Sequence, residues 1–389
     1  MYEGQMVFPQ VLEFLPRRVF DSCVRRYQGN RRVRGFSCRD QFLAMAFAQL
    51  TGRESLRDLE ICLRAVSDKL YHAGFRGSIS RSTLADANRT RDWQIYRDLG
   101  LALIERARRL YAADDLGIEL THTAYALDAT VIELCLNLFP WAHSQRQKAA
   151  IKVHTLLDLR GNIPCFLRVS GTKTRDCALL DDLPIEPGSF YLMDRDYNDY
   201  RRLHRIHRAG AFFVVRAKCN LTVRRQASRP VDRSTGLRSD QTVLLQDRRT
   251  RRKHPDRLRR VRYKNLQTGR RLIFVTNHFD LSALTITELY RQRWGIELFF
   301  KWVKQHLRIK HFLGNTPNAV KTQLWIALST YVLAAIMKRE LKIERSLAEI
   351  LQILSVTLFE KTPLFKALNE QTVPNSADTC PNQLSLFDF

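Results

Sequence analysis

In the N-terminal part of the chain, apolar residues recur at helical spacing behind residues that favour helix starts. The apolar run that opens at Cys38 ends at Gly52, where a glycine is expected to terminate a helix. Ser55 and Asp58 then have the Ser-x-x-acid spacing of a capped helix N-terminus. We therefore predict that residues 1–118 form a helical domain.

From about residue 121 the pattern changes to short apolar runs rich in β-branched and aromatic residues. A turn at Arg160-Gly161-Asn162 separates the second and third runs, which predicts a hairpin. A helix is expected at 199–208, between the fourth run and the fifth. Strands that form a hairpin first and later alternate with helices predict a mixed α/β sheet. The strand candidates are 124–136, 152–159, 163–170, 189–193 and 211–216.

The C-terminal part begins with a basic segment and then returns to helical spacing. Residues 222–271 hold 17 Lys or Arg and four Asp, interrupted by short strand-like patches that argue against full disorder. The apolar run at 322–337 is too short and too polar to span a bilayer, so we expect a core helix and no membrane partner. A further helix is expected at 346–358, and the polar, proline-containing segment 369–382 is typical of a linker.

The charge of the chain points to a polyanionic partner. Sixty-four Lys and Arg stand against 39 Asp and Glu, which gives a formal net charge of +25. Nucleic acid is the commonest partner of such a surplus, although a basic solvated surface without a partner is the alternative. The helical domain carries clusters of arginine, so DNA binding is favoured over an ordinary helical bundle. Eight scattered cysteines without a CxxC pair support neither a zinc knuckle nor a redox motif.

One window, YRQRWGIELFFKWVK at 290–304, places polar groups of four kinds on a largely apolar helix. Tyr290, Arg293, Glu297 and Lys304 are spaced at 0, 3, 7 and 14, so they fall within roughly 60° of one another. A helix that is apolar on its other sides is expected to be buried, and a buried carboxylate between two cations needs a reason. Structural ion pairing is one reason, and a metal and phosphate site is the other.

Two further carboxylates stand where they suit a shared metal site. Asp128 lies in the first strand candidate, and Asp194 directly follows the fourth. Together with Glu297 they offer the carboxylate oxygens that Mg²⁺ prefers, and two such ions are suited to phosphodiester chemistry. Arg293 and Lys304 are suited to binding phosphate, and Tyr290 to donating a hydrogen bond to it.

Here the residues meet a known family, because the chain resembles bacterial insertion-sequence transposases of the DDE class that carry the Tyr-x2-Arg-x3-Glu-x6-Lys signature. Tyr290, Arg293, Glu297 and Lys304 match the signature at all four positions, and Asp128 and Asp194 resemble the two preceding acids. The family usually has a glycine two residues after the second acid. Asp196 stands there instead, which leaves it as the alternative to Asp194.

The resemblance implies an α/β fold: an RNase H-like catalytic domain with a β-rich insertion, preceded by an all-helical DNA-binding domain. We expect the catalytic domain at 119–345, with its basic insertion at about 211–278. A C-terminal helical segment is expected at 346–370, and a flexible tail at 371–389.

The resemblance also implies a function, namely metal-dependent cut-and-paste DNA transposition through strand cleavage, a hairpin intermediate and strand transfer. The implied cofactors are two Mg²⁺ or Mn²⁺ ions held by Asp128, Asp194 and Glu297. The implied partners are the terminal inverted repeats, the target DNA and a second copy of the chain, in the bacterial cytoplasm at the nucleoid. An inactive or domesticated DNA-binding protein and an RNase H-like structure-specific nuclease are the alternatives.

Trp294 and a short apolar peptide near the end of the chain each have two interpretations. Trp294, next to Arg293, packs in the core or stacks on an exposed DNA base. Near the end of the chain, Gln383, Leu384, Leu386 and Phe387 resemble the short peptide by which bacterial proteins dock on the replication sliding clamp. Packing of these residues on the chain's own surface is the alternative.

Overall fold

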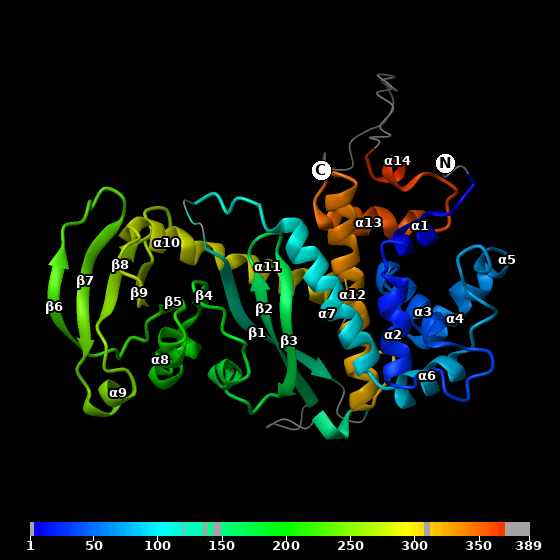
Figure 1. Ribbon diagram of the computed structural model, residues 1–389, viewed down its shortest axis with the longest axis horizontal. Helices are drawn as coiled ribbons and strands as arrows, with labels where there is room; N and C mark the ends of the chain where they lie inside the picture. The colour runs from blue at the N-terminus through cyan, green and yellow to red at the C-terminus, as the bar shows by residue number, and fades with distance from the viewer. Residues whose placement is uncertain are drawn as a thin grey trace, which may run out of the picture.

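The molecule is elongated, with a large β-sheet at one end and in the middle and a helical bundle at the other end (Figure 1). The computed structural model describes residues 4–118, 120, 122–134, 138–142, 149–306 and 312–369, apart from the side chains at positions 302, 305 and 306.

Five strands form the central sheet, in the order β3-β2-β1-β4-β5. Strands β1, β2 and β3 pair antiparallel, whereas β1, β4 and β5 run parallel to one another. This mixed order confirms the RNase H-like fold, and the expected β2–β3 hairpin is present. The strands are β1 (Ala124–Leu134), β2 (Ala149–Asp158), β3 (Ile163–Gly171), β4 (Phe190–Met193) and β5 (Phe212–Arg216).

Four more strands extend the same sheet to nine through the antiparallel pairing of β9 with β5. Three of them cover the strand-like patches of the basic segment. Strand β6 was not predicted, because its residues are mostly polar and exposed. Pairing with β7, rather than an apolar pattern, holds it in the sheet. These elements are β6 (Val223–Arg229), β7 (Leu237–Leu245), β8 (Leu258–Lys264) and β9 (Arg271–Thr276), with the short helix α9 (Arg248–Lys253) between β7 and β8.

Helices pack on both faces of the central sheet, and β4 and the first half of β1 are buried on both sides, whereas β3 is mostly only half-buried. On one face, Leu127 of β1 packs in a cluster with Leu203 and Ile206 of α8 (Tyr200–Arg208). On the other face, Ala126 belongs to the cluster that contains Ile296 of α11 (Trp294–His306). Successive side chains of a strand point to opposite faces, so the next residue of β1, Asp128, points to the α11 side.

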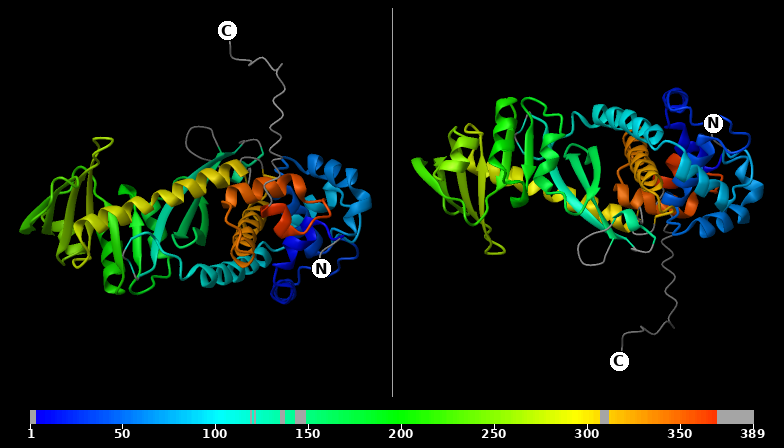
Figure 2. Two further views of the ribbon diagram at one scale, coloured as in Figure 1. Left: turned by 90° about the horizontal axis from the view of Figure 1, so that it is seen from above. Right: turned by 90° about the horizontal axis from the view of Figure 1, so that it is seen from below.

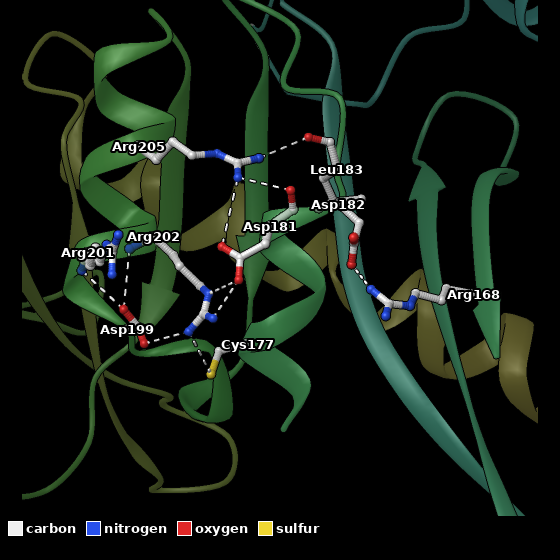
Figure 3. A network of polar contacts seen from close by, with 9 residues as sticks. All are labelled: Arg168, Cys177, Asp181, Asp182, Leu183, Asp199, Arg201, Arg202 and Arg205. Atoms are coloured by element: carbon white, nitrogen blue, oxygen red, sulfur yellow. Dashed lines mark hydrogen bonds and ion pairs between the residues drawn. The ribbon is translucent and has the colours of Figure 1, made fainter. Parts of the chain in front are cut away.

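A network of arginines and carboxyl groups clamps α8 against the short 3-10 helix η2 (Asp176–Asp181) (Figure 3). Arg202 of α8 contacts Asp181 at 2.6 Å and Asp199 at 2.8 Å. Arg205 donates to the backbone carbonyl oxygens of Asp181 and Leu183. Because α8 follows the loop that leaves β4, the network also restrains the loop that carries Asp194.

The helical bundle combines the N-terminal helices with the C-terminal ones, and α12 runs through it (Figures 1 and 2). By length and composition α12 is able to cross a membrane, and it is longer than the predicted run, but 94% of its apolar window is buried inside the protein. The prediction of a core helix is therefore confirmed. The helices are α1 (Val7–Glu13), α2 (Arg17–Arg26), α3 (Cys38–Leu50), α4 (Leu56–Ala65), α5 (Ser67–Leu70), α6 (Arg81–Thr90), α7 (Gln94–Tyr111), α12 (Pro317–Glu340), α13 (Leu347–Thr357) and α14 (Leu364–Asn369).

Local capping explains why several of these helices begin where the sequence predicts. Ser37 and Asp40 form a complete capping box at the start of α3, and the Ser55 side chain accepts a hydrogen bond from the Asp58 backbone N–H at 3.0 Å. Each cap satisfies a backbone N–H that has no partner within the helix. The predicted starts are therefore confirmed at single-residue level.

Candidate active site

Two of the three predicted acids lie side by side because β1 and β4 are neighbouring parallel strands. Leu127 of β1 is in register with Met193, the last residue of β4. The next residue on each strand is an acid, Asp128 on β1 and Asp194 just beyond β4. Asp128 also accepts a hydrogen bond from the Ala129 backbone N–H at 2.8 Å.

The third acid comes from α11, which lies against β1 (Figure 1). The single helix expected over 290–304 is wrong: α10 (Ala283–Gln292) ends just ahead of Arg293, and α11 begins just after it. The Arg293 guanidinium contacts Asp128 Oδ2 with Nη1 at 3.0 Å and Glu297 Oε1 with Nη2. One cation therefore stands between two of the predicted catalytic carboxylates.

Asp194 is held by two other side chains. The Tyr290 hydroxyl donates to Asp194 Oδ1 at 3.4 Å, and Arg216 Nη1 lies 3.9 Å from the same oxygen. Packing fixes the Tyr290 ring, whose centroid is 4.5 Å from that of Phe274. Asp196 is exposed in the turn η3 (Arg195–Tyr197), so the geometry favours Asp194 as the second acid.

The electrostatics of the site follow from burial and from the mutual repulsion of the acids. Burial raises the pKa of Asp128, and the charges of Glu297 and Asp194 raise it further, whereas the Ala129 N–H and Arg293 lower it. Burial raises the pKa of Tyr290 to about 12, so its hydroxyl stays a hydrogen-bond donor at neutral pH. Burial disfavours the charge of Arg293, but Tyr290 and the two acids outweigh this effect and raise its pKa.

As the side chains stand, the described residues contain no group of three or more His, Cys, Asp and Glu arranged to hold a metal ion. At this site Arg293 stands between Asp128 and Glu297 and contacts both. The Arg293 side chain is 11% exposed, and its Nε is buried without a hydrogen-bond partner. The donor set is nevertheless of the type that hard divalent cations prefer, once that arginine withdraws.

The remaining predicted residues lie at different distances from this centre. Lys304 is half-buried on α11 and forms no ion pair with the acids in the described structure. Trp294 and Leu298 are 59% and 53% exposed, so the expectation that the apolar sides of this helix are buried is wrong for these two positions. The tail residues Gln383, Leu384, Leu386 and Phe387 lie outside the described residues.

Sequence reasoning missed Arg216, which ends β5 beside the Asp194 loop. Its only sequence signal is a basic residue at the end of the predicted strand that follows Asp194. That signal gains meaning only when β5 is known to neighbour β4.

The fold and the acids define an RNase H-like protein with an acidic site at the ends of its parallel strands. Residues 119–333 match the transposase DDE domain, and the chain belongs to this family. A domain of unknown function matches residues 3–76. The family as a whole uses divalent metal ions.

Curated relatives agree with this assignment. A protein of Sinorhizobium fredii named as a transposase, y4zB, is 35% identical over 60% of this chain and 66% of its own length. A protein of Geobacillus stearothermophilus, named as a probable transposase for insertion sequence element IS5377, is 32% identical over 53% of this chain and 54% of its own length. The chain therefore spans less than two thirds of either relative.

Among solved structures, the chain is similar to the piggyBac transposase in its synaptic complex with hairpin DNA. The TM-score is 0.45 and the identity 12%, over 97% of this chain and 87% of that one.

Proposed function

We propose that this protein is a DDE transposase that cleaves DNA at the ends of its own element and joins the freed ends to target DNA. The observation that carries the proposal is that Asp128 and Glu297 share one mostly buried arginine, Arg293, while Asp194 stands at the end of the neighbouring strand, in a chain of the transposase DDE domain family. A structural ion-pair cluster needs no such third carboxylate. Asp194 is close enough to raise the pKa of Asp128, and its nearest cation is Arg216, at 3.9 Å, rather than Arg293.

The three acids are the groups that would hold Mg²⁺ or Mn²⁺, most simply as a pair of ions. Bound divalent ions supply Lewis-acid stabilisation of the attacking and leaving oxygens of a phosphodiester. Asp128 is mostly buried, so its carboxylate is costly to keep charged without a compensating cation. Arg293 provides that compensation in the free protein. When Arg293 is released, the carboxylates would keep a negative charge that divalent cations can neutralise.

The signature side chains would then orient DNA. A guanidinium is suited to a bidentate grip on a phosphate, so Arg293 would move from the carboxylates to the DNA backbone. Lys304 lies about two turns beyond Glu297 on α11 and would add a point charge. The Tyr290 hydroxyl would donate to a phosphate oxygen, and the exposed Trp294 ring would stack on an unpaired base. The hairpin intermediate rests on the family resemblance alone.

The other proposed contacts with DNA come from charge. The insertion β6–β9 and α9 carries exposed arginines along much of its length, and these would hold the backbone near the cut. Within the helical bundle, the arginine clusters at 17–34 and 76–91 would recognise the terminal inverted repeats. Two element ends must meet, so a homodimer on DNA is expected, in the bacterial cytoplasm at the nucleoid.

The test uses a supercoiled plasmid that carries the gene with its native flanking DNA, together with Mg²⁺. Wild-type protein is expected to release the element and join it to a target plasmid. Asp128→Ala, Asp194→Ala and Glu297→Ala are each expected to abolish cleavage while retaining DNA binding in a mobility-shift assay.

Three results would contradict the proposal in different ways. Cleavage without joined products would favour the structure-specific nuclease, and binding without cleavage by the wild type would favour a domesticated DNA-binding protein. Normal cutting by any one alanine variant would remove that residue from the site.

The end of the chain supports a separate proposal, docking on the replication sliding clamp through Gln383, Leu384, Leu386 and Phe387. The support is the sequence pattern alone. A pull-down of the purified clamp is expected to fail with a Leu386→Ala, Phe387→Ala double variant. Equal recovery of the clamp by both proteins would reject the docking.

A further inference from the structure

A cavity of about 1220 Å³ opens beside α11, and its lining includes Gly295 and Leu298, on either side of Glu297 in the chain. Its walls come from the end of α7, the β2–β3 turn, α11, the end of α12 and the start of α13. Apolar side chains form much of the lining, and three lysines, Lys301, Lys338 and Lys342, surround it. The apolar lining includes Leu159, Leu298, Phe299, Tyr331 and Leu347.

Helix geometry connects this cavity to the proposed active site. At 100° per residue, Lys301, Trp294 and Leu298 follow Glu297 around α11 within roughly 100°. Trp294 and Leu298 are both more than half exposed, and Lys301 is exposed. The same helix buries Ile296 on its other side. An accessible strip therefore runs from Glu297 around α11 to the wall of the cavity.

The lining of the cavity holds four cations, Lys301, Lys338, Arg339 and Lys342, against two acids, Asp114 and Asp115. Arg339 is paired, since it contacts Asp114 at 2.7 Å and donates to the Leu110 carbonyl oxygen. Lys301, Lys338 and Lys342, in contrast, form no ion pair with any described acid. Asp115, the other lining acid, accepts a hydrogen bond from the Gly117 backbone N–H. A surplus of cations around a partly apolar space favours an anionic ligand that also has apolar faces.

Single-stranded DNA has this chemistry. Its phosphates match the lysines, and its unstacked bases match an exposed indole and an apolar lining, because every base has a face that stacks. In duplex DNA the base faces are stacked on one another, so a duplex presents only phosphates to this surface.

We propose that the cavity, together with the Trp294 and Leu298 strip, binds single-stranded DNA next to the scissile phosphate. The proposal rests on the proposed transposase function and deepens it, because it assigns a path to the unpaired strand that cleavage at an element end exposes. Trp294 would receive the first unpaired base beyond the acids. Lys301 and then Lys338 and Lys342 would follow the phosphates into the cavity.

The experiment measures the fluorescence anisotropy of a labelled oligothymidylate and of a labelled duplex of equal length. A Lys338→Gln, Lys342→Gln double variant of the full-length protein is expected to bind the single strand roughly tenfold more weakly and the duplex within twofold of wild type. Trp294→Ala, at an exposed position that folding does not need, is expected to weaken single-strand binding in the same way.

A Lys69→Gln, Lys361→Gln double variant is the matched control, because both lysines are exposed elsewhere on the helical bundle and the charge change is equal. The control is expected to bind both probes within twofold of wild type. Wild-type affinity of the cavity variants for the single strand, or an equal loss on both probes and in the control, would overturn the proposal.

Two further outcomes separate this inference from its alternatives. If wild-type protein cleaves the donor plasmid but the cavity variants bind single strands normally, only the inference fails, whereas a wild type that does not cleave rejects the proposed function itself. Lysine-dependent binding of a synthetic peptide of sequence 370–389, with unchanged oligonucleotide binding, would assign the cavity to the end of the chain instead.

Discussion

Arg293 contacts two carboxylates in this structure and is proposed to bind a DNA phosphate during the reaction. It cannot do both at the same time. In this structure it bridges Asp128 and Glu297, and its Nε is buried without a partner. A group that neutralises two acids in the free protein competes with any metal ion for them, because both satisfy the same carboxylate oxygens. The free protein is therefore expected to bind metal weakly until a DNA phosphate draws the arginine away.

Replacing Arg293 with Gln is predicted to raise the affinity of the DNA-free protein for Mn²⁺ by roughly tenfold, about 1.4 kcal/mol. The physical reason is that two carboxylates left without their cation repel each other and favour a divalent ion. Isothermal titration calorimetry, or the electron paramagnetic resonance signal of free Mn²⁺, measures the change in Mn²⁺ affinity directly. Arg291→Gln, an exposed neighbour on α10, is the control. Equal or weaker Mn²⁺ binding by Arg293→Gln would contradict the competition.

At the scale of elements, the β2–β3 turn positions α11 against the sheet. Gly295 of α11 packs directly on this turn, since a Cβ there would lie 2.9 Å from Asn162 Oδ1. Gly161 in the turn has a φ of +72°, and a Cβ there would overlap the Tyr111 ring. That ring cannot easily yield, because the Tyr111 hydroxyl donates to the Ala335 carbonyl oxygen of α12 at 2.8 Å. The glycines at positions 161 and 295 therefore allow the turn to lie close to Tyr111 on one side and to α11 on the other.

Gly161→Ala is predicted to lower the free energy of unfolding by roughly 2–4 kcal/mol, through its left-handed backbone and the collision with Tyr111. Urea unfolding, followed by circular dichroism, measures the shift in midpoint. Gly171→Ala, at the far end of the same hairpin, is the control, because a Cβ there meets no atom within 4 Å and the backbone is extended. Its midpoint is expected to stay close to that of wild type. The same small shift for Gly161→Ala would show that the turn tolerates a side chain.

At the scale of the whole molecule, the net charge of +25 is spread unevenly. Arg251 and Arg252 of α9 are exposed and form no salt bridge with a described acid, whereas Arg259 of β8 is buried and contacts Asp240 at 2.8 Å. Some arginines of the insertion therefore hold its fold, and the others remain available to a polyanion. Long-range attraction by such a surface depends strongly on ionic strength.

An Arg251→Gln, Arg252→Gln double variant is predicted to reduce the slope of log K against log[salt] for duplex DNA by roughly two, because each lost phosphate contact removes about 0.9. Anisotropy titrations at several salt concentrations give the slope. The Lys69→Gln, Lys361→Gln double variant changes the charge equally and is expected to keep the wild-type slope. A wild-type slope for the α9 variant would place the insertion away from the DNA.

Much of the secondary structure was predictable because its causes are local. The strands of the central sheet follow short apolar runs, and α3 and α4 begin at side chains that cap their own backbone. Strand β6 and helix α9 were not predicted. The first depends on pairing with a distant partner strand, and the second is a six-residue basic stretch whose only local cue is the Asp247 cap.

The order of residues along the chain already placed Tyr290, Arg293 and Glu297 on one side of a helical segment, since helical spacing is a property of neighbours. It also supplied the acids, the excess of positive charge and the turn between β2 and β3. The folded arrangement alone brought Asp128 beside Asp194 and set Arg293 between two carboxylates, because sheet order is decided by pairings between remote segments. It also left Trp294 exposed, since which apolar side chains are covered depends on what packs against the helix.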